Sequence, residues 1–346
     1  MTVAAFALAA EHCPDVLSFD GNIDHSMLPA LLNQLQILGT STMTAQLNTK
    51  VSSQPPEHYI TSNNLQALPN IGYADGKESN AESNALASIN TLLTWFNNYG
   101  LDDLNNANLM NRVDSKFILP MSFLPALLWE LRSDYRVLDI DKKRCFSYHN
   151  QYFDTPNMDL YHDHHNGKLN RYKVRSRCYV DTATEYLEVK LKNNQSRTVK
   201  TRIKLDNNAN ESSICHQFIQ QEMNGKNSNL DVTQQSGYRR ISLANEEKAE
   251  RLTLDFDLWY KNKRGNNQVT LPHFFIAELK QNKKSKHSPF YQLMTKLNFF
   301  PTSFSKYCIG CALLYPGEIK TNRFKAILTQ IQKFNRITAV PSIERN

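Results

Sequence analysis

Cations alternate with apolar residues along three consecutive segments of this chain, and this alternation limits what the segments can form. Segments 171–177, 186–192 and 198–205 carry a charged residue at every second position and mainly uncharged residues between them. Successive side chains of a β-strand point to opposite faces, so each segment is predicted to be a strand with one charged face. That face holds one carboxylate, Glu188, among Arg171, Lys173, Arg175, Arg177, Lys190, Lys192, Lys200, Arg202 and Lys204.

A face of this composition indicates an anionic partner. The charged face of a half-buried strand normally meets water. Solvated faces, however, mix acidic with basic residues, which limits repulsion across neighbouring strands. The cations on the face predicted here would repel one another unless an anion binds to them. If the sheet closes into a barrel, the charged faces line a tunnel and the apolar faces pack outward against helices.

The distribution of charge along the chain supports the same interpretation. The formal net charge of the 346 residues is +7, but residues 1–105 carry −8 and residues 106–346 carry +15. The basic surplus therefore belongs to one part of the chain, and such asymmetry favours a polyanionic partner.

Short strands and helices are predicted from residue 107 onward. The expected strands are 112–118, 144–153, 169–180, 184–192, 197–205, 237–243, 251–260 and 273–281, and the expected helices are 122–133, 289–299, 303–314 and 322–337. The predicted class is α+β, with an antiparallel eight-stranded β-barrel and flanking helices. We divide the chain into a polar acidic extension (1–105), a tunnel domain (106–318) and a C-terminal amphipathic helix and tail (319–346).

The extension carries no recognisable chemistry. Apolar spacing predicts helices over 27–38 and 84–99, and the Pro- and polar-rich stretch of about 40–80 between them is expected to be loop or disorder. No stretch of the chain approaches the roughly 18 consecutive apolar residues of a membrane span. The first ten residues lack the Lys or Arg of a secretory signal, so we expect no membrane span and a cytoplasmic location.

Carboxylates on the other strands have two interpretations. Asp114 alternates with Arg112 and Lys116, while Asp255 and Asp257 are expected on one face, opposite Leu252, Leu254, Phe256 and Leu258. Glu278 shares a face with Lys280. Such carboxylates could hold Mg²⁺ or Mn²⁺, which bridges phosphate oxygens, or could form salt bridges to neighbouring cations. For Glu278 the residues alone leave both possibilities open.

Nine short motifs resemble, in order, the VTC (vacuolar transporter chaperone) domain, the polyphosphate polymerase branch of the CYTH-like triphosphate tunnel superfamily. Each is short, and their order over roughly 107–316 carries the resemblance. They are Arg112-Val-Asp-Ser-Lys116, Tyr152-Phe-Asp-Thr155 with Leu160-Tyr161, Lys173-Val-Arg175-Ser-Arg177-Cys-Tyr179, Leu187-Glu-Val-Lys190, Lys200-Thr-Arg202, Tyr238-Arg-Arg240, Arg251-Leu-Thr-Leu-Asp255, Ala277-Glu-Leu-Lys280, and Phe304-Ser-Lys306-Tyr307 with Gly310.

The resemblance implies a basic tunnel that binds ATP, triphosphate or polyphosphate with Mg²⁺ or Mn²⁺. The residues it implies as phosphate-gripping groups are Lys116, Arg175, Arg177, Lys190, Lys200, Arg240 and Lys306. Ser305 is expected to add a hydroxyl, His164 a further basic group and Glu278 the metal ligand. From the charged strand faces we add Lys173 and Arg202 as substrate-binding residues and Glu188 as a second metal ligand. The implied reaction transfers the terminal phosphoryl group of ATP to a polyphosphate chain, without a covalent enzyme intermediate.

The chain departs from the family pattern in two respects. Ser303 stands where a Lys often precedes the Ser-Lys pair, so one phosphate contact is missing. Neither a phosphate-sensing helical module at the N-terminus nor a following membrane segment is evident. Two other functions therefore stay open: a non-catalytic module that binds polyphosphate or another polyanion, and a triphosphate hydrolase of the same superfamily.

Three other patterns are weaker. The run His162-Asp-His-His165 is expected in an extended or loop segment, where neighbouring side chains diverge and do not chelate one metal. Cys308 and Cys311 have no second pair at zinc-like spacing and are expected to be buried on a helix. Base stacking needs aromatic rings on the same face as the cations. Tyr179 shares that face on its segment but Tyr172 lies on the other, so phosphate and not nucleic acid is the expected partner.

Overall fold

The computed structural model describes residues 80–103, 112–195, 197–205, 211–226 and 229–338. The predicted helix at 27–38 and almost all of the predicted loop after it lie outside these residues. Of the described residues, 80–94 belong to one compact unit and 95–338 to another. In the first unit, α3 (Asn80–Leu93) confirms the predicted helix but ends before its expected end at 99. The hydroxyls of Thr91 and Thr94 donate hydrogen bonds to backbone carbonyls there, and threonine has a low helix propensity.

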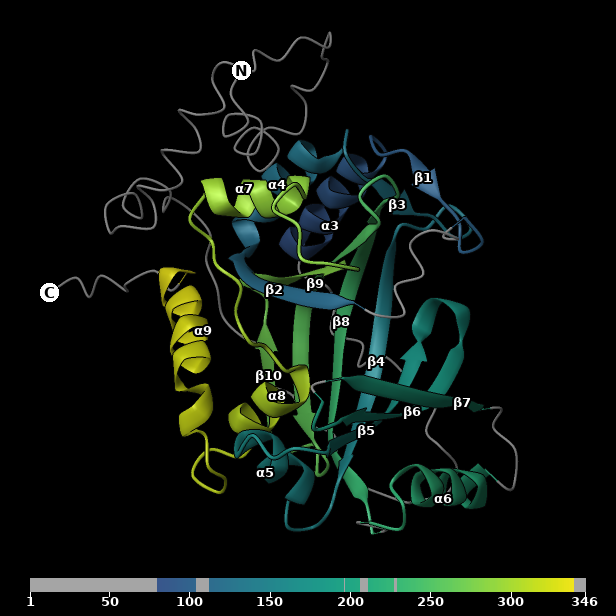
Figure 1. Cartoon of the computed structure of the whole chain (residues 1–346). Helices are drawn as coiled ribbons and strands as arrows, with labels where there is room; N and C mark the ends of the chain where they lie inside the picture. Colours follow the sequence, from purple (N-terminus) through teal and green to yellow (C-terminus); the bar gives the residue numbers. More distant parts are fainter. Residues whose placement is uncertain (1–79, 104–111, 196, 206–210, 227–228, 339–346) are drawn as a thin grey trace, which may run out of the picture. The chain divides into compact units, whose positions relative to one another are not determined.

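The second unit is built on an antiparallel sheet whose main path has eight strands (Figure 1). In spatial order these are β2 (Val113–Pro120), β11 (Phe274–Gln281), β9 (Glu250–Asn262), β8 (Asp231–Asn245), β4 (Cys145–Asp154), β5 (Arg171–Tyr179), β6 (Thr184–Lys192) and β7 (Thr198–Leu205). All eight predicted strands are thereby confirmed, and so is the α+β class. The predicted closure into a barrel is wrong for the backbone of the described residues, because β2 and β7 lie at opposite ends of the strand order.

Three short strands extend this sheet beyond the prediction. The strand β1 (Asn98–Tyr99) pairs in parallel with β3 (Arg136–Leu138), which in turn pairs with β8. The strand β10 (Gln268–Leu271) pairs with β9. Each is at most four residues long, which is too short for a periodic pattern to reveal.

Helices flank the sheet at the ends of its strands. The predicted ones are present as η3 (Met121–Phe123) with α4 (Leu124–Leu131), α7 (Pro289–Lys296), α8 (Lys306–Leu314), and η5 (Asn322–Phe324) with α9 (Lys325–Thr338). Figure 1 shows α4 and α7 at one end of the central strands and α5 (Asp159–His165) and α8 at the other. The helices α5, α6 (Glu211–Glu222) and η4 (Val180–Thr182) were not predicted.

The faces of β5 and β6 opposite their cations are apolar and buried, as predicted. Tyr172, Val174, Leu187 and Val189 form one core cluster with side chains of α6 and α5. Burying an aliphatic side chain of this size contributes roughly 1.5–3 kcal/mol. On β2, the outward Phe117 packs edge-to-face on Phe290 of α7, with ring centroids 5.2 Å apart. The charged residues lie on the opposite face of these strands, here called the inner face.

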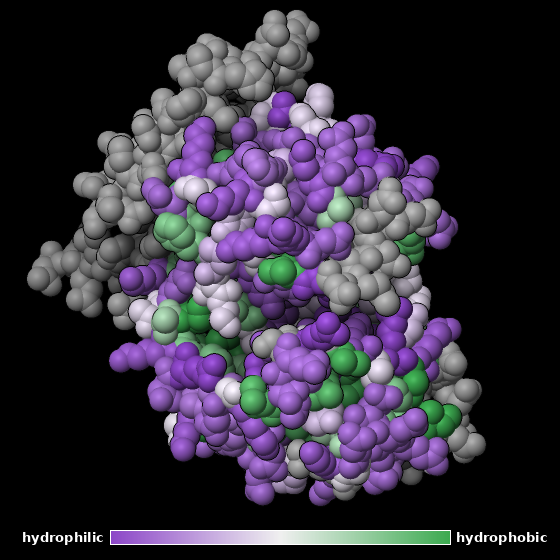
Figure 2. All heavy atoms as spheres, viewed as in Figure 1, coloured by the Kyte–Doolittle hydropathy of each residue, from purple (hydrophilic) through white to green (hydrophobic). Residues whose placement is uncertain are grey.

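A β-bulge changes the parity of β9 and corrects one prediction. The register between β8 and β9 shifts between Gly237 and Arg239, and Asp257 has φ +50°. Before the bulge Asp255 points to the inner face and is 1% exposed. Asp257 instead lies 3.3 Å from Arg239 and is exposed, so the two aspartates do not share a face. Figure 2 shows that hydrophilic residues cover most of one side of the molecule, with small hydrophobic groups between them.

Candidate functional site

The cations of β5, β6 and β7 lie in rows across the inner face. The register places Lys173 opposite Lys190, and Lys190 opposite Lys200. The next row joins Arg175 to Glu188, and Glu188 to Arg202. Directly opposed like charges on neighbouring strands destabilise a sheet. These rows therefore favour the presence of an anion.

Glu188 is the carboxylate of this row, and it is buried between two cations. Its Oε2 accepts hydrogen bonds from Nη2 and Nε of Arg175 at 2.6 and 2.8 Å, and Lys200 pairs with its other oxygen. Burial acts to raise the pKa of Glu188, but the charges of Arg175, Arg177 and Lys200 outweigh it and lower that pKa to about 2. The carboxylate is therefore ionised and already engaged.

Two lysines of the same region carry charge without a carboxylate partner among the described residues. Lys173 donates from Nζ to the Ser305 hydroxyl at 2.8 Å, and burial together with neighbouring cations lowers its pKa. The ammonium of Lys190 is confined by protein atoms and lies near Lys173 and Lys116, which lowers its pKa to about 8, although the side chain keeps access to solvent. An incoming anion would stabilise both ammonium groups.

Neutral groups orient Arg177 on this face. Its Nε donates to Oδ1 of Asn150 at 3.0 Å, and its Nη2 donates to the Tyr238 hydroxyl at 2.9 Å. Burial acts to raise the pKa of Tyr238, but Arg177 and Arg240 outweigh it and lower that pKa. The guanidinium is held in one orientation without losing its charge to a carboxylate.

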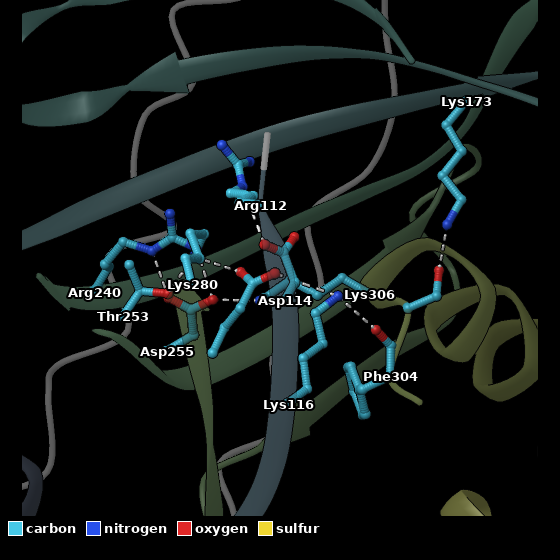
Figure 3. A network of polar contacts seen from close by, with 12 residues as sticks. Arg112, Asp114, Lys116, Lys173, Arg240, Thr253, Asp255, Lys280, Phe304 and Lys306 are labelled. Atoms are coloured by element: carbon cyan, nitrogen blue, oxygen red, sulfur yellow. Dashed lines mark hydrogen bonds and ion pairs between the residues drawn. The ribbon is translucent and has the colours of Figure 1, made fainter. Parts of the chain in front are cut away.

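Glu278 lies at the β2–β11 pair, on the same face. Its carboxylate is 3.6 Å from Nζ of Lys116 and 2.9 Å from Nζ of Lys280. Burial acts to raise the pKa of Glu278, but the two ammonium groups hold it well below its usual range. Lys116 also donates to the Phe304 carbonyl at 3.2 Å, and Figure 3 shows how the lysines and carboxylates of this network face one another.

Asp255 joins the sheet to α8. Arg240 holds it with two hydrogen bonds, of 2.6 and 2.8 Å, and Lys306 pairs with the same carboxylate (Figure 3). Burial opposes ionisation, but these two cations hold the pKa of Asp255 well below its usual range. Lys306 is the first residue of α8, whose N-cap Ser305 accepts a hydrogen bond from the backbone of Cys308. The N-cap therefore places both Ser305 and Lys306 at the inner face.

His164 lies next to these cations, but it is neutral and helical, whereas the sequence predicted a basic residue in an extended segment. It belongs to α5, not to an extended segment, and the buried Asp154 holds the first turn of α5 by accepting from the backbone of Leu160 and Tyr161. Burial and the charge of Lys173 lower the pKa of His164 to about 2, so the ring is neutral. Its Nε2 donates to the Tyr172 carbonyl at 3.0 Å, and its Nδ1 accepts from Nε of Arg171 at 3.0 Å. His164 therefore orients Arg171 and carries no charge of its own.

The predicted residues thus gather on one face, together with others that charge parity alone did not single out. Asp255 and Lys280 share the parity of the site, but only the strand register reveals their partners. Asn150 and Tyr238 are uncharged, so no charge pattern reports them. Arg202 lies with its guanidinium carbon 4.5 Å from the ring centroid of Tyr186. Cys308 and Cys311 are buried in α8, as predicted.

The donor set fits a metal that is held jointly with phosphate. Within the described ranges, no group of three or more His, Cys, Asp or Glu side chains is arranged to hold a metal ion. Glu278 and Asp114 nevertheless lie on one face of adjacent strands, in neighbouring register positions. Mg²⁺ is commonly bound by one or two carboxylates plus substrate phosphates. Glu278 is engaged by Lys116 and Lys280, and Glu188 by Arg175 and Lys200, so the metal role of each stays a prediction.

The chain is similar to solved structures at low sequence identity. Among solved structures, a proposed adenylate cyclase of Bacillus halodurans aligns with a TM-score of 0.39 at 13% identity, covering 56% of this chain and 94% of that one. A proposed adenylyl cyclase from Hippeastrum, described as having a dominant triphosphatase activity, aligns with a TM-score of 0.37 at 14% identity, covering 59% and 96%. No curated protein matches the chain.

None of the helices in the described part of the chain is long and apolar enough to cross a membrane.

Residues 111–315, more than half of the chain, match the model of the VTC domain. This range contains the rows of cations, Glu278 and the start of α8, and the chain therefore belongs to the VTC domain family.

Proposed function

We propose that this chain is a metal-dependent phosphotransferase that moves the terminal phosphoryl group of ATP onto a polyphosphate chain lying on the inner face. The observation that carries the proposal is the continuous set of cations from β5–β7 to Lys306 of α8 and Lys116 of β2. Membership of the VTC domain family supports the coarser statement, an enzyme that acts on triphosphates or polyphosphate. We include in the proposal a cytoplasmic location and a VTC-like domain that spans residues 106–318.

The chemistry requires positioning and charge neutralisation more than covalent catalysis. Phosphoryl transfer spreads negative charge over the equatorial oxygens, and fixed cations stabilise that charge without reorganisation. Arg177 and Arg175 present planar guanidinium groups that suit bidentate contact with phosphate. Asn150 and Tyr238 hold the first of these in place. A divalent metal, when bound, would be held in part by Glu278 and would neutralise part of the phosphate charge.

An anion on this face competes with the carboxylates for their partners. Arg175 and Lys200 pair with Glu188, and Arg240 and Lys306 with Asp255. Lys173 and Lys190, like Arg177, have no such pair among the described residues, so they are available for a first phosphate contact. We expect a polyphosphate chain to bind first along Lys173 and Lys190.

A second function, binding of polyphosphate without turnover, is favoured by one observation. The predicted metal ligands, Glu278 and Glu188, are each already paired with two cations. If those pairs persist in the complex, the face grips an anion but holds no catalytic metal.

One experiment separates the possibilities. Purified full-length protein is incubated with ATP and Mn²⁺ or Mg²⁺, and long-chain polyphosphate, ADP and free phosphate are resolved over time. Chains that accumulate with ADP support the polymerase. Free phosphate without chains overturns it in favour of a hydrolase. Retained binding of polyphosphate with neither product leaves the binding module.

A further inference from the structure

Four tyrosines form a row across the inner face. Tyr238 of β8 stacks on Tyr148 of β4, with ring planes 8° apart and centroids at 5.3 Å. Tyr148 contacts Tyr179 of β5 at 5.1 Å, and Tyr179 meets Tyr186 of β6 edge-to-face at 5.9 Å. The row therefore runs beside the phosphate-gripping cations and on the same face. The two tyrosines of segment 171–179 alone did not reveal it.

The two ends of this row differ in exposure. Tyr238 and Tyr148 are 3% and 8% exposed, and the guanidinium of Arg240 lies 5.2 and 5.1 Å from their ring centroids. Tyr179 and Tyr186 are only half-buried, and the exposed Arg202 places its guanidinium carbon over the ring of Tyr186 at 4.5 Å. The outer end thus offers a partly open ring and a planar cation. Both kinds of surface stack on nucleobases.

This outer end lies at a suitable separation from the phosphate site. Tyr186 is directly opposite Arg177 on the neighbouring strand. The Arg175–Glu188 pair is two residues further along, which is about 7 Å of strand. A nucleotide whose terminal phosphates lie at Arg177 and Arg175 must place its ribose and base on one side of them. The tyrosine side offers stacking surface, while the continuation in the other direction brings Lys173 opposite Lys190.

We propose that Tyr186, with Tyr179 beside it and Arg202 over it, is a stacking site for the base of a nucleoside triphosphate. This inference rests on the proposed function and deepens it by assigning each end of the strands. The base stacks on the Tyr186 ring, from which the Arg202 guanidinium moves to the first phosphate. The terminal phosphates extend past Arg177 toward Lys173 and Lys190, which lie opposite each other. A purine gains more than a pyrimidine at such a site, because it offers the larger ring area.

The test compares a nucleotide with the same phosphate chain lacking a nucleoside. Dissociation constants are measured by calorimetry for the non-hydrolysable β,γ-imido analogue of ATP and for imidotriphosphate, both with Mg²⁺. We expect wild-type protein to bind the nucleotide roughly 10-fold more tightly, the smaller end of what base stacking contributes. Tyr186→Leu should abolish that preference while changing the imidotriphosphate constant less than about twofold. Tyr186→Phe, which keeps the ring, should retain it.

Two further variants keep the test decisive. Tyr291→Leu is the matched control, because Tyr291 is also half-buried under a cation, Lys284 at 5.4 Å from its ring centroid, but lies on α7 outside the row. It should leave both constants unchanged. Tyr186→Trp provides a readout besides affinity, since stacking should quench its fluorescence with the nucleotide but not with imidotriphosphate.

Each outcome decides the inference. Equal wild-type affinities, or equal losses for both ligands in Tyr186→Leu, overturn the stacking site and leave the proposed function standing. Binding of neither ligand by folded wild-type protein overturns the proposed function, and the stacking site with it. Loss of nucleotide preference alone, with the fluorescence change, supports both.

Discussion

The inner face has two halves that treat charge differently. The half formed by β2, β8, β9 and β11, here called the paired half, ties its cations to Glu278 and Asp255. The half formed by β5, β6 and β7, here called the cationic half, sets its cations against the single carboxylate Glu188. Each of these cations in the paired half thus has a carboxylate partner, whereas Lys173, Arg177 and Lys190 of the cationic half have none among the described residues.

This difference indicates a division of labour. Buried ion pairs fix the position of both partners, at the expense of desolvation, and so favour exact placement of a reacting group. Uncompensated cations give long-range attraction and a large gain when an anion arrives. We infer that the paired half holds the reaction centre and the cationic half holds the chain. The predictions below test this division, from the largest expected effect to the smallest.

Glu278→Gln should reduce turnover of ATP at least 100-fold while the dissociation constant for triphosphate changes less than about fivefold. The substitution removes the charge that would help hold a metal but leaves the cationic half intact. Steady-state product formation and calorimetry measure the two effects. The comparison variant is Glu188→Gln, in which the lost carboxylate belongs to the cationic half. It should bind triphosphate more tightly, because Arg175 and Lys200 lose their competing partner. Unchanged turnover in Glu278→Gln would sink the metal assignment.

Asp255→Asn should lower the free energy of unfolding by about 3 kcal/mol, because two cations lose their buried counter-charge. Denaturant unfolding at neutral pH measures it, with Asp114→Asn as control. Asp114 pairs with Arg112 at 3.0 Å in a largely exposed position, so its loss should cost less than about 1 kcal/mol. The depressed pKa of Asp255 means that its contribution is present above the unfolded pKa near 4 and is lost as the pH falls below it. Equal costs for the two variants would contradict the difference in burial.

Arg175→Ala should weaken triphosphate binding about 10-fold and reduce its dependence on salt, because one charge that faces phosphate is lost. Binding isotherms at three salt concentrations provide both values. Arg136→Ala is the control: Arg136 also forms ion pairs, to Glu246 and Asp103, but on β3. It should leave binding within about twofold of wild type. Normal binding by Arg175→Ala would mean that β5 does not face the substrate.

The strands of both halves could be predicted from the sequence because their side chains alternate. Charge parity alone placed Arg175, Lys190 and Lys200 on one face of three neighbouring strands, and the register confirms this placement. Closure could not be predicted in the same way, because it depends on whether edge strands meet. The parity of β9 also failed beyond Asp255, where one extra residue in a bulge turned Asp257 to the other face.

The partners of the predicted residues were beyond the reach of the sequence. A seven-residue helix such as α5 is too short to show a period, so the sequence predicts an extended segment with a basic residue at His164. Its neutral state depends on burial beside Lys173 and on acceptance of a hydrogen bond from Arg171. The pairing of Asp255 with Lys306 joins residues 51 positions apart. Only the folded arrangement brings such groups together.

The smallest effect concerns pH and belongs to the cationic half alone. Lys190 has a pKa of about 8 in the free protein, and a bound phosphate chain should raise it by supplying negative charge. Triphosphate affinity should therefore fall a few-fold as the pH rises above 8 and level off at the higher pKa of the complex. Lys190→Arg keeps its charge across this range, so its affinity should be nearly flat between pH 7 and 9. The same slope in both proteins would move the titrating group to Lys173, whose pKa is also lowered and whose ammonium lies opposite on β5.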